Sequence, residues 1–134
     1  MKNPKIYHFS SIADHRGMLN FIEAERDIPF KIKRVYYMQG LNEQPRGFHA
    51  HKTLRQVLIC LHGQFSLLLQ SDLSKPQQII LDSPKKGVLV DKLVWHELYD
   101  FSENCIVLAL ASDYYHESDY IRDKSVFLKS IQQN

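Results

Sequence analysis

Apolar and β-branched residues occur along this chain in short runs, separated by turn residues such as Gly, Pro, Asn and Asp. Such runs are typical of β-strands, whose side chains alternate between two faces. The runs that we interpret as strands are 6–9, 18–23, 32–38, 46–51, 57–61, 65–70, 78–81, 88–90, 93–99 and 105–111. Only residues 123–131 carry apolar positions at helical spacing without a breaker. The pattern predicts one all-β domain over residues 1–134, a β-sandwich or barrel with a short C-terminal helix.

Charge and hydropathy exclude several classes of partner. The formal net charge of +2 is too small to indicate a nucleic-acid or anionic-membrane partner. No apolar run approaches the ~20 residues that cross a bilayer, and the N-terminus lacks the apolar core of a signal peptide. Cys60 and Cys105 lie in apolar strand-like runs, where buried, reduced thiols are expected. We therefore expect a cytoplasmic protein with no membrane or nucleic-acid partner.

Two histidines on one predicted strand are the strongest chemical signal in the sequence. His49 and His51 are separated by one residue, so their side chains point to the same face of the sheet. Arg46 and Lys52 flank them and provide positive charge. Such a pair is suited either to holding a metal ion or to moving protons on a negatively charged ligand.

The residues around the histidine pair favour proton transfer over metal binding. A small β-barrel with His-x-His and a later histidine, here His96, evokes the cupin family. Metal-binding cupins carry a glutamate about five residues after the His-x-His pair, whereas this chain has Gln56. A neutral amide is a weak metal ligand, and the nearby cations Lys52 and Arg55 oppose a metal charge. We expect no metal, and a purely structural role for both histidines is the less favoured alternative.

The chain closely resembles the sugar nucleotide 3,4-ketoisomerases, which are RmlC-like cupins acting on dTDP-4-keto-6-deoxy-glucose. The resemblance covers nearly the whole chain, and the WH pair with the DYIR ending makes it specific. The shared motifs are DHRG at 14–17, IKRVYY at 32–37, RGFHAHK at 46–52, VWHE at 94–97, YDFS at 99–102, LASDYY at 110–115 and SDYIR at 118–122. The resemblance implies a cupin, or jelly-roll, β-barrel.

The resemblance also implies a reaction and a set of site residues. The keto group moves from C4 to C3 of the sugar through an enediol, which requires neither a cofactor nor a metal. His49 and His51 are the expected acid and base. The expected substrate-binding residues are Arg16, Tyr37, Arg46, Lys52, Gln56 and His96. Alternation places only one of Tyr36 and Tyr37 toward the barrel interior, and the sequence alone does not decide which.

Family membership further implies a homodimer in which an N-terminal strand, residues 6–9, reaches the partner subunit. Arg16 together with His96 is similar to the branch that yields dTDP-3-keto-6-deoxy-galactose, and the gluco epimer is the alternative product. The product would pass to an aminotransferase, toward a dideoxyamino sugar of the bacterial cell surface. Two other functions stay open from the sequence: a metal-dependent cupin enzyme and a non-catalytic sugar-binding cupin.

Overall fold

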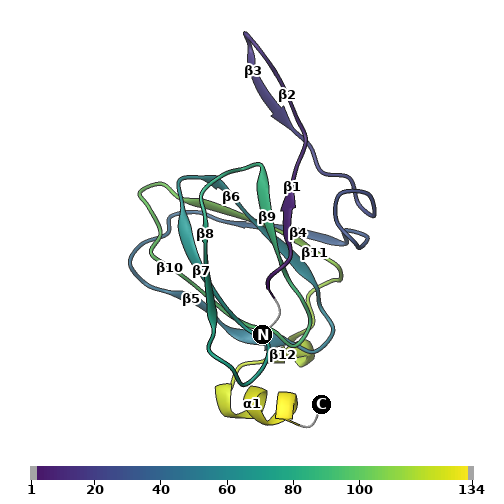
Figure 1. Cartoon of the computed structure of the whole chain (residues 1–134), viewed down its shortest axis with the longest axis vertical. Helices are drawn as coiled ribbons and strands as arrows, with labels where there is room; N and C mark the ends of the chain where they lie inside the picture. Colours follow the sequence, from purple (N-terminus) through teal and green to yellow (C-terminus); the bar gives the residue numbers. More distant parts are fainter. Residues whose placement is uncertain (1–2, 133–134) are drawn as a thin grey trace.

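The computed structural model describes residues 3–132 and forms a barrel of two antiparallel sheets, each with five strands (Figure 1). The strands are β1 (Ile6–His8), β2 (Ser11–Asp14), β3 (Gly17–Asn20), β4 (Arg34–Met38), β5 (Arg46–His51), β6 (Gln56–His62), β7 (Phe65–Gln70), β8 (Gln77–Leu81), β9 (Lys86–Val90), β10 (Trp95–Tyr99), β11 (Ile106–Ala111) and β12 (Tyr120–Ile121). A 3₁₀ turn (Glu117–Asp119) precedes β12, and helix α1 (Lys124–Gln132) ends the described chain. The all-β prediction with one C-terminal helix is confirmed.

One sheet has the strand order β1-β9-β6-β11-β4, and the other has the order β12-β5-β10-β7-β8. The main core lies between the two sheets and includes Leu58 and Cys60 of β6. The alternate residues Val57 and Ile59 face the other way and pack with Ile28 and other residues of the 21–32 segment. Strand β6 is therefore buried on both faces, which explains its continuous apolar sequence.

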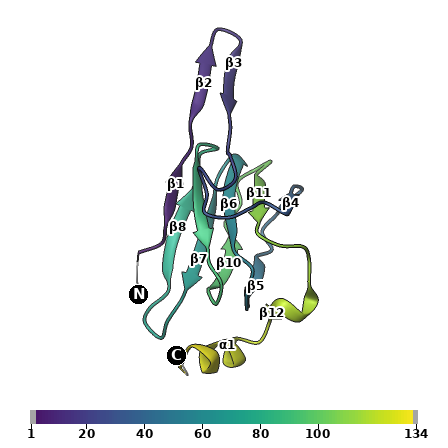
Figure 2. The same ribbon diagram turned by 90° about the vertical axis from the view of Figure 1, so that its right-hand side faces the viewer.

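A hairpin formed by β2 and β3 projects beyond the barrel (Figures 1 and 2). Its apolar side chains Ile12, Met18 and Leu19 are exposed. Gly17 occupies the turn with φ +135°, a conformation that favours glycine. The sequence prediction began this region at residue 18 and missed β2, because Ser11–Asp14 has little apolar content.

Helix α1 lies at one end of the barrel, where it packs against β5, β10 and β12 (Figure 1). The Asp123 side chain caps it by accepting hydrogen bonds from the Ser125 and Val126 amides. Phe127 is fully buried, and its ring lies 5.7 Å from that of Trp95 on β10. No helix in the described part of the chain is both long and apolar enough to cross a membrane.

Candidate active site

Three histidines meet on the inner face of the sheet that contains β5 and β10. His49 and His51 project from β5 on one side, while Ala50 between them packs toward helix α1. His96 on β10 is the register partner of His49. The ring centroids are 4.9 Å apart for His49–His51, 4.5 Å for His49–His96 and 5.7 Å for His51–His96. Period-two alternation and strand pairing together bring the three imidazoles into one cluster.

A bulge beside the histidines shapes this part of the sheet. The register between β5 and β10 shifts between His96 and Glu97. Gly47 has φ +94°, and a Cβ there would lie 2.9 Å from the carbonyl oxygen of His96. Only glycine fits this combination of backbone angle and close approach. Gly47 therefore allows β5 and β10 to come together where His49 and His96 face each other.

Burial keeps all three imidazoles neutral at physiological pH. It lowers the pKa of His51 to about 4 and that of His96 to about 3, and it also lowers the pKa of His49. His49 Nδ1 lies 3.0 Å from the Gly47 carbonyl oxygen. Because a carbonyl can only accept, Nδ1 carries the proton and Nε2 keeps its lone pair. His49 is thus an unprotonated base at neutral pH.

His51 differs from the other two histidines in the hydrogen bonding of its Nδ1 atom. Its side chain is buried, and its Nδ1 has no hydrogen-bond partner among the described residues. The nearest carboxylate oxygen, Asp119 Oδ2, lies 3.6 Å from Nδ1, longer than a hydrogen bond. Asp119 is held in place by the amides of Thr53 and Leu54. A small movement would let Asp119 stabilise a protonated His51.

A hydrogen-bonded chain orients His96. The Tyr36 hydroxyl donates to Gln56 Oε1 at 2.5 Å, and Gln56 Nε2 lies 3.4 Å from His96 Nε2. His96 Nδ1 donates to the Val94 carbonyl oxygen at 3.2 Å, so its Nε2 accepts from the Gln56 amide. Burial raises the pKa of Tyr36 to about 12, which keeps its hydroxyl protonated as a donor. The Tyr36 hydroxyl, the Gln56 amide and the His96 ring therefore each have a defined partner in this hydrogen-bonded series.

His49 and His96 line a pocket of about 250 Å³, and His51 lies behind them in the cluster without lining it. Arg34, Arg46 and Arg122 line it, and among the described residues its lining includes no carboxylate. The remaining lining residues are Tyr36, Met38, Gly47, His49, Gln56, Leu58, His96, Leu98 and Tyr120. Three guanidinium groups around neutral imidazoles favour an anionic ligand on which protons are moved.

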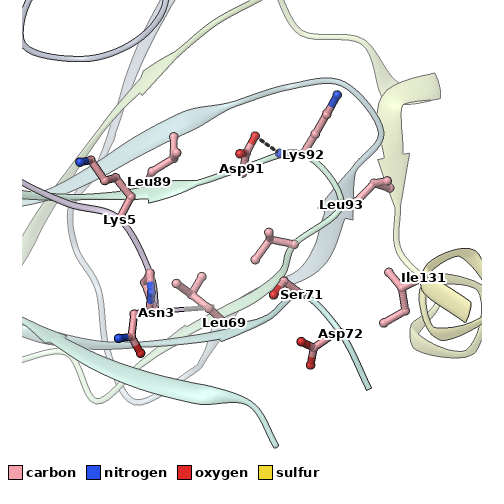
Figure 3. Close-up of a pocket in the computed structure, with 12 residues that line it drawn as sticks. Asn3, Lys5, Leu69, Ser71, Asp72, Leu89, Asp91, Lys92, Leu93 and Ile131 are labelled. Atoms are coloured by element: carbon pink, nitrogen blue, oxygen red, sulfur yellow. Dashed lines mark hydrogen bonds between the residues drawn. The ribbon is translucent and has the colours of Figure 1, made fainter. Parts of the chain in front are cut away.

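A larger cavity of about 510 Å³ lies between the N-terminal segment, the ends of β7 and β9, and helix α1 (Figure 3). Leu69, Leu93 and Ile131 contribute to its largely apolar wall, with Lys5 and Asp91 among the polar groups around it. Its lining, within the described residues, contains none of the candidate acid or base groups. Chemistry rather than size therefore assigns the histidine pocket as the candidate active site.

The donor set fits a resident metal ion poorly. The ligating nitrogens of the three histidines lie within 4.8 Å of one another, so imidazole donors are available. However, the Oε1 atom of Gln56, at the position where metal-binding cupins carry glutamate, already accepts the Tyr36 hydroxyl. Arg34, Arg46 and Arg122 line the same pocket and oppose a further positive charge. The arrangement suits acid–base chemistry better than cation binding.

Five residues selected from the sequence come together here: His49, His96, Arg46 and Gln56 line the pocket, and His51 belongs to the histidine cluster beside it. Three others do not. Tyr37 is 65% exposed, because alternation along β4 turns it outward and brings Tyr36 to the pocket; the choice of Tyr37 is corrected to Tyr36. Lys52 is exposed after the end of β5 and does not line the pocket. Arg16 lies in the hairpin turn, where it pairs with Asp14.

Sequence reasoning also missed pocket residues that the structure reveals. Arg34 shares the inward face of β4 with Tyr36, so choosing the correct tyrosine would have found it. Tyr120 packs against both strand histidines, with ring centroids 4.9 Å from His49 and 4.5 Å from His51. Arg122 lies 4.3 Å over the Tyr120 ring. Both belong to the SDYIR motif, which carried a family signal without an assigned role.

Comparison with known proteins identifies relatives that align with almost the whole chain. The FdtA family model, described as WxcM-like, C-terminal, matches residues 2–132. A TDP-4-oxo-6-deoxy-α-D-glucose-3,4-oxoisomerase from Aneurinibacillus thermoaerophilus is 52% identical over 128 residues, which cover 95% of this chain and 91% of the relative.

Solved structures of the QdtA 3,4-ketoisomerase are similar to this chain in both fold and sequence. The QdtA 3,4-ketoisomerase of Thermoanaerobacterium thermosaccharolyticum, a double mutant in complex with TDP, superposes with a TM-score of 0.95 and 43% identity over 99% of this chain and 96% of that one. A histidine-to-asparagine mutant of QdtA, in complex with TDP-4-keto-6-deoxyglucose, gives a TM-score of 0.95 at 41% identity over 100% and 97% of the two chains.

A structure with lower sequence identity is similar to this chain in fold alone. The epimerase RmlC of Legionella pneumophila has a TM-score of 0.75 at 20% identity over 88% of this chain and 71% of that one. The RmlC-like cupin fold and the resemblance to sugar nucleotide 3,4-ketoisomerases are both confirmed. The chain belongs to the FdtA family, and the relatives that it matches over nearly their whole length are sugar 3,4-ketoisomerases.

Proposed function

We propose that this chain isomerises TDP-4-keto-6-deoxyglucose by moving the keto group from C4 to C3. The observation that carries the proposal is the pair of neutral imidazoles, His49 and His51, 4.9 Å apart beside a pocket lined by three arginines. The names of the relatives support the substrate: a TDP-4-oxo-6-deoxyglucose oxoisomerase and a QdtA structure with TDP-4-keto-6-deoxyglucose bound.

The chemistry needs no external oxidant, because C3 is oxidised while the neighbouring C4 is reduced. A base removes the proton from C3, which is acidified by the C4 ketone, and an enediolate forms. O4 then takes up a proton to become the new hydroxyl, a proton is delivered to C4, and the hydroxyl proton of C3 is lost as the new ketone forms. We assign the first step to His49, whose Nε2 lone pair is free, and proton exchange at the adjacent carbon to His51.

The rim arginines are suited to the diphosphate of the nucleotide. Arg46 and Arg122 are exposed at the pocket, where a solvated diphosphate can reach them. Arg122 is held by Glu117 through bonds of 2.9 Å and 3.0 Å. Planar guanidinium groups bind phosphate oxygens in pairs, which orients the sugar toward the histidines.

A homodimer is part of the proposal, with the β2–β3 hairpin as the exchanged element. Strand β1 pairs with β9 of its own chain through Ile6↔Val88 and His8↔Lys86. The expected exchange of residues 6–9 with the partner subunit is therefore replaced by exchange of the hairpin. The hairpin instead presents Ile12 (64% exposed) and Leu19 (59% exposed) as a cross-strand pair with no cover from the described chain. A second copy would cover this apolar surface and receive Arg16 from the hairpin turn.

The proposal also includes the configuration of the product at C4. We keep dTDP-3-keto-6-deoxy-galactose as the product, with the gluco epimer as the alternative; His96 in the pocket wall supports control of stereochemistry there. Arg16 joins that control only if a second copy brings it to the site.

A cytoplasmic location is supported by the buried thiols of Cys60 and Cys105, whose pKa values burial raises.

Turnover of the purified protein tests the proposal. Incubation with TDP-4-keto-6-deoxyglucose in the presence of a chelator should give a 3-keto sugar, detected by NMR, with no stoichiometric metal by elemental analysis. A requirement for bound iron or zinc would favour a metal-dependent cupin instead. Binding of the nucleotide sugar without any conversion would favour a non-catalytic sugar-binding cupin.

A further inference from the structure

Arg34 is a cation that none of the roles above uses. It lies on β4, opposite Ala111 of β11, and lines the pocket together with His49 and His96. Two tyrosine rings hold its guanidinium: the Cζ atom lies 5.3 Å from the Tyr36 ring centroid and 5.7 Å from that of Tyr115. Cation–π contacts with two rings help to position the charged group without using its hydrogen-bond donors.

One side-chain donor of Arg34 has no acceptor among the described residues. Its Nε atom is buried and has no hydrogen-bond partner, and no carboxylate of residues 3–132 forms an ion pair with it. A buried donor without an acceptor is costly, and a bound ligand or an ordered water can supply the acceptor. Arg122 differs, because Glu117 already accepts from its guanidinium.

We propose that Arg34 is a catalytic residue that donates hydrogen bonds to the sugar oxygen on which negative charge develops when C3 loses its proton. This role rests on the proposed 3,4-ketoisomerase function. The Arg34 side chain is half-buried near two tyrosine rings and lines the pocket with His49 and His96, whereas Arg46 and Arg122 are exposed at the rim. The reacting carbons must approach the histidines, so the charge forms near Arg34, while the solvated diphosphate meets the rim.

The proton and electron balance shows where this donor acts. As the C3–H bond breaks, its electron pair forms the C3–C4 double bond, and the carbonyl pair of C4 moves onto O4. Arg34 donates to this O4 anion and remains protonated throughout. The O4 anion then takes up a proton and becomes the new hydroxyl, C4 takes up a second proton, and the C3 hydroxyl gives its proton to a base as C3 and its oxygen form the new ketone. The substrate supplies both the oxidised and the reduced carbon.

An Arg34→Gln variant separates this role from nucleotide binding. Removing one oxyanion donor lowers kcat by about 10²–10³-fold in other enzymes, and we expect a similar loss. The affinity for TDP alone, measured by calorimetry, should change by less than about threefold, because TDP lacks the reacting sugar. Lys33→Gln is the matched control, since Lys33 immediately precedes Arg34 but is exposed and pairs with Asp113. The kcat of Lys33→Gln and its affinity for TDP should both match those of the wild type.

Chemical rescue distinguishes a reacting group from a packing group. Arg34→Ala, with its fold checked by circular dichroism, should regain at least about tenfold in kcat when guanidinium is added at millimolar concentration, while Lys33→Gln should not respond. If Arg34→Ala does not fold, Arg34→Lys keeps the charge between the rings and should still lose more than about tenfold in kcat, because an ammonium cannot reproduce the planar fork.

Each result is decisive. An unchanged kcat in Arg34→Gln, or a fall in TDP affinity as large as the fall in kcat, would overturn the oxyanion role and leave the ketoisomerase function intact. A folded Arg34→Ala that guanidinium does not rescue would also count against it. A wild-type protein that converts no TDP-4-keto-6-deoxyglucose would instead reject the proposed function, and the role of Arg34 with it.

Discussion

His49 lies directly across the β5–β10 pair from His96, and the two ring centroids are 4.5 Å apart. The contact joins a residue with a free Nε2 lone pair to one whose Nε2 already accepts from Gln56. Although both rings belong to the same cluster, their hydrogen bonds give them different capacities. His49 can take a proton from a ligand, and His96 serves as a fixed wall of the pocket.

Replacing either strand histidine should abolish turnover. His49→Asn and His51→Asn should each fold normally and retain less than about a tenth of the activity, because acid–base groups typically contribute about 10²–10⁴-fold. Initial rates with TDP-4-keto-6-deoxyglucose check this, with circular dichroism as the fold control. If both variants kept more than about a tenth, acid–base catalysis by this pair would be the wrong account.

The sequence predicted those features that depend on local periodicity. The spacing of His49 and His51 guaranteed a shared face, and the apolar runs located β6 and β11 correctly. Tyr37 was the wrong choice because alternation gives two equivalent phases until the register with β11 is known, and that register turns Tyr36 inward. Arg34 on β4 and Arg122 just after β12 are far apart in sequence, so only the tertiary fold shows that they share a pocket with His49 and His96.

Acid should destabilise the fold through the buried histidines. Burial lowers the pKa of His51 to about 4 and of His96 to about 3, whereas the unfolded chain has values near 6.5. Below pH 6.5 the unfolded state therefore binds protons that the folded state does not. Stability should fall as pH drops from about 6.5 toward 4, with a slope of at most about 1.4 kcal/mol per pH unit for each group.

Urea denaturation between pH 7.5 and 4.5 measures this slope. His96→Gln should flatten it, even if that variant is less stable at neutral pH. His8→Gln should leave the slope unchanged, because His8 is exposed on β1. Equal slopes in the wild type and His96→Gln would show that the buried imidazole is not the source of the acid sensitivity.

Gln56 should control whether the pocket accepts a metal ion. A Gln56→Glu variant replaces the amide with the ligand type found in metal-binding cupins and adds a negative charge among three arginines. We expect its affinity for zinc, measured by calorimetry, to rise at least about tenfold over the wild type. Its turnover should fall, because a carboxylate cannot donate to His96 Nε2 as the amide does. Wild-type zinc affinity equal to that of the variant would contradict this account.

The exposed hairpin pair should hold a dimer together. The wild-type protein should be a dimer by light scattering at micromolar concentration, and an Ile12→Glu/Leu19→Glu double variant should be a folded monomer. Burying each of these side chains contributes about 1.5–3 kcal/mol, which two charges would remove. Ile80→Glu is the matched control: Ile80 on β8 is also exposed, at 49%, but lies outside the hairpin. A monomeric wild type would refute the dimer.

The configuration at C4 of the product should be galacto. The coupling constant between H4 and H5 of the product, or of its more stable amino derivative, should be small; a large diaxial coupling would mean the gluco epimer. Changing Arg16 and His96 together should alter the ratio of the two epimers more than changing the exposed His8 and His116. A gluco product would overturn this assignment and leave the ketoisomerase reaction standing.

The central claim is that neutral imidazoles move protons between C3 and C4 of a TDP-linked keto sugar. The most direct test is NMR of the reaction with TDP-4-keto-6-deoxyglucose in deuterated water. The wild type should give a 3-keto sugar with solvent deuterium at C4, and His49→Asn should give neither within the same time. A wild-type reaction that leaves the keto group at C4, or equal conversion by His49→Asn, would contradict the account.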